Sequence, residues 1–201
     1  MKLILATALI GSLAGSRADA QYPRVAARAS PALLAVVTPI LDSARASGLP
    51  TAPLEEKVLE GITKQADAPR IAAALRRLTG ELSQARDVLG ERATVRQLVA
   101  GADALRVGLT PRDLARVRTI RSDRDPAVAL ELATDLVTQG VPVDTASTLV
   151  LSVLVAGVSD GDLQQLRQSV ARDVAGGVPP SVAASLRARA LVGTERGTEK
   201  P

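Results

Sequence analysis

The sequence predicts an all-α protein: a compact array of about seven to nine short antiparallel helices, arranged as a bundle or a short α-solenoid-like stack after an N-terminal signal peptide. Glycine followed by an apolar residue recurs where helices should end, and Ser, Thr or Asp followed by Pro recurs where helices should begin. Between these signals, apolar residues repeat every three or four positions. The 201 residues are 46% hydrophobic and 23% charged, which is typical of a globular chain.

The first twenty residues have the three parts of a secretory signal peptide. Lys2 supplies the positive charge, Leu3–Ala14 is apolar, and Ala18-Asp19-Ala20 is a small-residue cleavage site before Gln21. The apolar run is shorter than the ~20 residues that a membrane-spanning helix needs. We therefore expect cleavage between Ala20 and Gln21, export to the periplasm or the extracellular space, and no transmembrane segment in the mature chain.

The rest of the chain divides by composition. Residues 21–29 are short and polar, and we expect a flexible lead-in there. Residues 30–192 carry the helix signals and predict the helical domain, in which the punctuation near 107–110 allows a sub-division. Residues 193–201 are polar and contain two glycines, which predicts a disordered tail.

Four dipeptides pair a good helix cap with a proline. The cap side chain accepts an unpaired backbone N–H, and proline lacks the N–H that would be unpaired at the first helical position. Pro39 also predicts that 32–41 is a short helix followed by a second one, because proline disrupts a helix interior. The four dipeptides are Ser30-Pro31, Thr38-Pro39, Thr110-Pro111 and Asp125-Pro126.

Helix ends share one pattern, in which glycine takes a left-handed conformation and the next apolar residue folds back on the last turn. The pattern occurs at Gly48-Leu49, Gly108-Leu109, Gly140-Val141, Gly157-Val158 and Gly177-Val178. Apolar stripes of helical spacing lie between these ends. They predict helices over 53–65, 69–89, 94–107, from 111, before 140, before 176 and after 179.

Residues 69–89 carry a seam of alternating three- and four-residue steps, as in a coiled coil. Because such a seam can pair two helices, it also predicts a homodimer. The residues expected at that contact are Ile71, Leu75, Leu78 and Leu82.

The segment Ala146–Ala156 is apolar nearly all round, which favours a helix buried in the middle of the bundle. It is too short to span a membrane. Its Val and Leu content also allows a buried strand, although Gly157 and the neighbouring helices favour the helix.

Absences exclude several classes of chemistry. The chain has no Cys, His, Trp or Phe and one Tyr, which removes disulfides, zinc or haem ligation by Cys or His, and His-based catalysis. It also lacks the glycine-rich phosphate loops and the nucleophile elbow. Acid groups at 55–60, 123–125 and 160–162 fit helix starts and solvated faces better than a catalytic or metal site. We expect no enzyme, cofactor or metal.

Arginines concentrate on the helix that begins at Pro111. This pattern predicts a face that binds an anion or a partner; the alternative is a solvated face whose Arg stems cover apolar surface. A net charge of +4 is too small to indicate nucleic-acid binding. The candidate binding residues are Arg112, Arg116, Arg118 and Arg121.

Together these patterns predict an exported, non-enzymatic helical binding protein, whose partner is another protein or an acidic envelope component. The alternative is a structural or self-associating assembly protein of the bacterial cell envelope.

Overall fold

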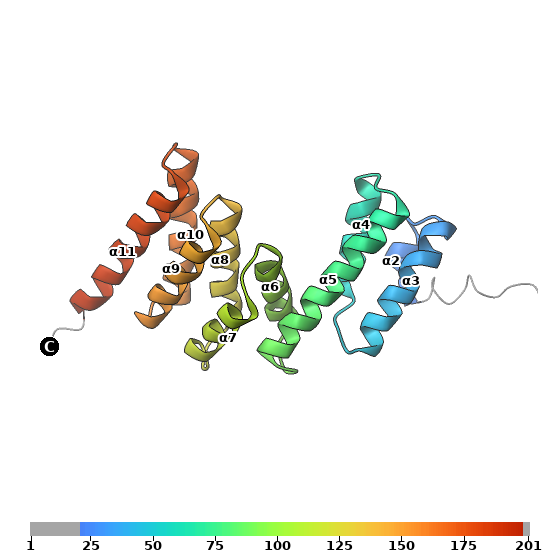
Figure 1. The fold of residues 1–201 in the computed structure, drawn as a ribbon, viewed down its shortest axis with the longest axis horizontal. Coiled ribbons are helices and arrows are strands. Elements are labelled where there is room, and N and C mark those ends of the chain that lie inside the picture. Colours follow the sequence, from blue (N-terminus) through green and yellow to red (C-terminus); the bar gives the residue numbers. More distant parts are fainter. Residues whose placement is uncertain (1–20, 199–201) are drawn as a thin grey trace, which may run out of the picture. The chain divides into compact units, whose positions relative to one another are not determined.

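The computed structural model describes residues 21–198, with side chains up to Gly193, and is all-α over that range, with no strand among the described residues. The predicted all-α class is confirmed, and the structure describes ten helices where seven to nine were expected (Figure 1). They are α2 (Pro23–Ala26), α3 (Pro31–Ala46), α4 (Ala52–Thr63), α5 (Ala68–Leu89), α6 (Val95–Arg106), α7 (Pro111–Ile120), α8 (Ala127–Thr138), α9 (Val143–Val155), α10 (Asp160–Ala175) and α11 (Pro180–Thr198).

Packing divides the chain into two compact units, and the division falls after Arg77, inside α5. The predicted sub-division near 107–110 is therefore misplaced. That segment is a tight turn between α6 and α7 of the second unit, in which Leu109 is buried and its N–H donates to the Ala104 carbonyl at 3.0 Å. A turn that packs its own apolar residue is not a linker.

The first unit contains α2, α3, α4 and the start of α5, and the predicted flexible lead-in is part of its core. Tyr22 is 1% exposed and Val25 is fully buried. The Tyr22 hydroxyl donates to the Asp42 carboxylate at 2.8 Å, and the Arg45 guanidinium lies 4.8 Å from the ring centroid. The lead-in prediction was wrong at 22–26 because the one aromatic ring of the chain has a large apolar area to bury.

Pro39 does not split α3, so the prediction of two short helices was also wrong. Pro39 and Ala35, whose carbonyl Pro39 leaves without a helical donor, are both exposed, and water can solvate that carbonyl. Thr38 does not act as a cap: its hydroxyl is buried without a hydrogen-bond partner. Ser30 does cap α3, accepting the Leu33 N–H.

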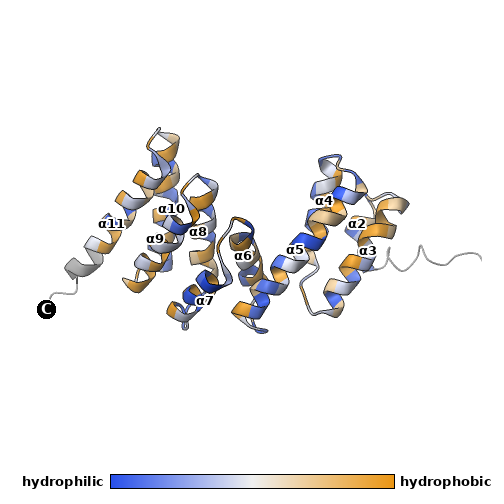
Figure 2. Cartoon of the chain, in the orientation of Figure 1, coloured by the Kyte–Doolittle hydropathy of each residue, from blue (hydrophilic) through white to orange (hydrophobic). Residues whose placement is uncertain are grey.

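The second unit contains three successive helical hairpins arranged in two layers (Figure 1). Helices α6, α8 and α10 pack side by side in one layer, and α7, α9 and α11 form the other. The hairpins begin at Val95, Ala127 and Asp160, so they repeat every 32 or 33 residues. Figure 2 shows hydrophobic residues along α8 and α9, which lie in the middle of the two layers, and many hydrophilic ones along α7.

The predicted glycine junctions are confirmed. All five glycines have positive φ, between 73° and 107°. The residue after each donates to the carbonyl five positions back, as Val141 does to Leu136 at 2.9 Å. A sixth junction of the same geometry was not predicted, because its left-handed residue is Gln65, with φ 54°, and not a glycine. Ala66 then donates to the Gly61 carbonyl.

The apolar segment 146–156 lies in α9 up to Val155, with Ala156 as the C-cap, which excludes the strand alternative. One face is buried, including Val150 and Val153, but Ser152 and Val155 are exposed, Val155 by 74%. Complete burial was the wrong expectation. Helix α9 has neighbours on both sides in its own layer and α8 beneath, which leaves its outer face in solvent.

The chain ends differ from the expected domain limits. Helix α11 continues to Thr198, six residues past the predicted limit at 192, and Gly193 does not interrupt it. Residues 1–20, where a signal peptide is predicted, and residues 199–201 lie outside the described part of the chain. Among the described helices, none combines the length and apolar character needed to cross a membrane.

Candidate functional site

The four candidate arginines do not form one face. Arg112, Arg116 and Arg118 are exposed on α7, whereas Arg121, directly after the helix, is 4% exposed. Their side chains have three different environments, and only one of these leaves the guanidinium groups available to a ligand.

Arg121 has a structural role. Its guanidinium pairs with the Asp160 carboxylate and donates from Nη2 to the Val158 carbonyl at 3.2 Å. These bonds join the end of α7 to the turn that begins α10. The prediction that Arg121 is a binding residue was wrong, because the side chain is buried and its donors are used within the chain.

Arg118 also has a structural role. Its Nη1 donates to the Val88 carbonyl at 2.6 Å, near the C-terminus of α5. Carbonyls in the last turn of a helix lack helical donors, and a cation there is favourable because the helix dipole is negative at that end. Arg118 therefore fastens α7 to the end of α5.

Arg112 and Arg116 lie one turn apart beside a groove of about 440 Å³ between α7 and α9. Ala115 and Ile120 of α7 and Leu151 of α9 form its apolar lining. Neither guanidinium has an ion-pair partner within the described residues. We call this feature the Arg112–Arg116 groove.

Asp113 follows Arg112 in the sequence, but its side chain has a structural role. Its side chain caps α7 through Thr110 and accepts the Ser147 hydroxyl at 2.7 Å, which links α7 to α9. Burial raises the pKa of Asp113, but hydrogen bonds from Thr110 and Ser147 and the charge of Arg116 hold it below its usual value. Asp113 therefore stays charged at neutral pH and keeps its partners.

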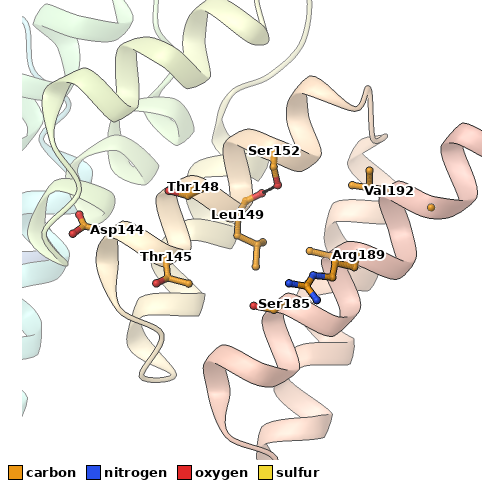
Figure 3. A pocket seen from close by; sticks show the side chains of 10 residues that line it. Asp144, Thr145, Thr148, Leu149, Ser152, Ser185, Arg189 and Val192 are labelled. Atoms are coloured by element: carbon orange, nitrogen blue, oxygen red, sulfur yellow. Dashed lines mark hydrogen bonds between the residues drawn. The ribbon is translucent and has the colours of Figure 1, made fainter.

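A second, larger groove lies on the other side of α9, between α9 and α11 (Figure 3). It has a volume of about 710 Å³, within the range of ligand-binding clefts. Sequence reasoning missed it because its lining is mostly Ser, Thr and small apolar residues from helices forty positions apart. The lining residues are Asp144, Thr145, Thr148, Leu149, Ser152, Ser185, Ala188, Arg189, Val192 and Gly193.

The acidic clusters are engaged in local interactions. The carboxylate of Glu60 accepts from Lys57 and Lys64, each at 2.5 Å, and these bonds lower its pKa to about 2. Asp125 accepts the Ala127 N–H at the start of α8 and an N–H of Gln97. No group of three or more metal-ligating side chains occurs in the part of the chain that the structure describes.

The seam expected to form a homodimer is buried within the single chain. Ile71, Leu75 and Leu82 are 3%, 0% and 0% exposed, and Leu78 is half-buried. An a/d pattern cannot distinguish pairing with a second copy from packing against the helices of its own chain. Ile71, Leu75 and Leu82 are core residues of the single chain and do not offer a free dimer surface.

Comparison of the chain with protein-family models, with curated proteins and with solved structures finds no match in any of the three. The function must therefore be inferred from the surfaces of this protein alone. Both grooves lie on the layer formed by α7, α9 and α11, one on each side of α9. This layer is the candidate functional surface.

Proposed function

We propose that the protein is an exported, non-enzymatic helical binding protein that holds an acidic partner in the Arg112–Arg116 groove. The partner is another protein or an acidic component of the cell envelope. The observation that carries the proposal is that the guanidinium groups of Arg112 and Arg116, which have no ion-pair partner among the described residues, lie beside an apolar groove. The three stacked hairpins of the second unit resemble a short α-solenoid. Solenoid proteins commonly bind partners along one extended surface, which supports a binding role.

The chemistry of the groove favours an anionic ligand. Residues four apart on a helix lie about 6 Å apart along its axis, so two guanidinium groups at this spacing can contact neighbouring carboxylates or phosphates. Arginine binds such groups through two parallel N–H donors. Ile120, which is 37% exposed, and Leu151 supply apolar surface that a partner would remove from water.

Crosslinking in the native cell, followed by mass spectrometry, tests the proposal with matched variants. We expect Arg112→Glu/Arg116→Glu to lose the partner that the wild-type chain captures. Arg24→Glu/Arg28→Glu is the control, because it makes the same charge change at the same spacing on exposed residues of the first unit. A partner profile that is unchanged in the first variant would exclude this groove.

Export has its own test. We expect N-terminal sequencing of the protein recovered from periplasmic or culture fractions to begin at Gln21, as the Ala18-Asp19-Ala20 site predicts. Replacing Ala18 and Ala20 with bulky residues should block processing and leave the longer chain associated with the membrane. Recovery of the full-length chain in the cytoplasm would contradict export.

A structural or self-associating role in the envelope is the second candidate, and one observation favours it. Val182 and Leu186 lie one turn apart on α11 and are 48% and 59% exposed. Sedimentation across a dilution series separates the candidates. A dimer that Leu186→Asp dissociates would favour assembly, and a monomer at all concentrations would remove this alternative.

A further inference from the structure

We propose that the groove between α9 and α11 binds a short, extended peptide segment with an acidic side chain at its centre. This site is separate from the Arg112–Arg116 groove and stands or falls independently of it. The proposal rests on the lining of the groove, the charge at its middle and its length along the two helices.

The only basic residue that lines this groove is Arg189 of α11. Its side chain is exposed and has no ion-pair partner within the described residues. Figure 3 shows the guanidinium directed away from α11 into the space between the helices, at the level of Leu149. The cation therefore lies midway along the groove, where its N–H groups can donate to a carboxylate of a bound ligand.

The hydroxyl groups around Arg189 suit a peptide backbone. The hydroxyl groups of Thr145, Thr148 and Ser185 have no hydrogen-bond partner in the described part of the chain, whereas the Ser152 hydroxyl donates to the Leu149 carbonyl. A hydroxyl both donates and accepts, so it can pair with either the N–H or the C=O of an extended chain. Leu149, Ala188 and Val192 provide apolar surface between these polar groups.

The length of the groove fits a peptide segment. The lining runs from Asp144 to Ser152 on α9, which corresponds to about 12 Å along the helix axis. An extended chain advances about 3.3 Å per residue, so three to four residues fill this length. The carboxylate of Asp144 at one end of the groove would repel an acidic side chain of the peptide at that end. We therefore place the acidic residue of the peptide at its centre, beside Arg189.

The experiment is an amide chemical-shift titration of the full chain with blocked pentapeptides of alanine that differ only in the central residue: glutamate, glutamine or lysine. We expect the glutamate peptide to shift amides of 144–152 and 185–193. The glutamine peptide should bind at least about tenfold more weakly, because a charge-assisted pair is lost. No shifts at millimolar glutamate peptide, or equal binding of all three peptides, would overturn the proposal.

Two variants and one competitor complete the test. Arg189→Gln should weaken the glutamate peptide about tenfold or more. Arg187→Gln, which makes the same charge change on the same helix, should bind normally because Arg187 faces Asp173, with N–O distances of 2.7 and 2.8 Å. Free glutamate that binds as tightly as the peptide would show a small-anion site and refute the peptide assignment. Shifts confined to 112–120 would do the same while supporting the Arg112–Arg116 groove.

Discussion

The pKa of the Tyr22 hydroxyl is a measurable property that reports on the folding of the first unit. Burial, and next the hydrogen bond to Asp42, raise its pKa to about 12 from an ordinary value of about 10. The fold therefore favours the neutral phenol. The stabilisation that this provides is complete below pH 10 and is lost as the pH rises from 10 through 12.

We expect a tyrosinate absorbance titration of the folded protein to show a midpoint near pH 12, falling to about 10 in denaturant. The chain has one Tyr and no Trp, so the signal belongs to Tyr22 alone. Asp42→Asn should lower the folded midpoint, because it removes a nearby negative charge. Circular dichroism at each pH controls for unfolding, and a midpoint near 10 in a fully helical sample would contradict the contacts of Tyr22.

The arginines of the α7 region differ in environment, and stability should separate them. Arg121→Met removes the donor to the Val158 carbonyl and should cost about 1–3 kcal/mol of unfolding free energy. Arg112→Met, in the exposed groove, should change it by less than about 0.5 kcal/mol. Urea unfolding curves of the two variants provide the measurement. Equal effects would mean that Arg121 is not a structural residue.

At the scale of helices, the sequence correctly predicted the features that depend on neighbouring residues, namely helix caps and glycine-ended helices. Ser30 and Thr110 cap their helices, and the glycine junctions have the expected geometry, because the signal and its partner lie within six residues. Expectations failed where tertiary packing decides. Pro39 is tolerated because it faces solvent, and Tyr22 is buried where its side chain contacts Asp42 and Arg45 of α3.

The same distinction applies to the candidate site. The charge pattern made Arg112 and Arg116 candidate binding residues, but it could not separate them from Arg121, whose partner Asp160 lies 39 positions away. The groove between α9 and α11 has no local signal, since it exists only when two hairpins stack. Periodicity found the 71–82 seam but could not show that the chain itself covers it.

Three glycines should respond differently to alanine, because their helical contexts differ. Gly140→Ala, at φ 101°, should cost about 1–2 kcal/mol from backbone strain. Gly101→Ala places a Cβ 2.9 Å from the Ala85 Cβ and should cost about 1–3 kcal/mol from overpacking. Gly80→Ala, with open space around it on α5, should stabilise by about 0.5–1 kcal/mol. Thermal unfolding ranks the three, and stabilisation by Gly140→Ala would contradict the left-handed junction.

At the scale of the molecule, the two units share one continuous helix. Helix α5 carries buried side chains on both sides of the division, Ile71 and Leu75 before it and Leu82 and Ala85 after it. If the second unit unfolds, the last part of α5 loses its support, and a helix shortened from one end frays toward the other. We therefore expect the two units to unfold together, although each has its own core.

Tyr22 makes this testable, because its fluorescence reports on the first unit alone, whereas far-ultraviolet dichroism reports on all helices. Leu130→Ala removes a fully buried side chain of α8 in the second unit and should cost about 2–5 kcal/mol. Coupled units predict that this variant lowers the urea midpoint of the Tyr22 signal as well as that of the dichroism. Leu54→Ala in α4 is the reciprocal variant. A Tyr22 midpoint that stays at the wild-type value while the dichroism splits into two transitions would show that α5 does not couple the units.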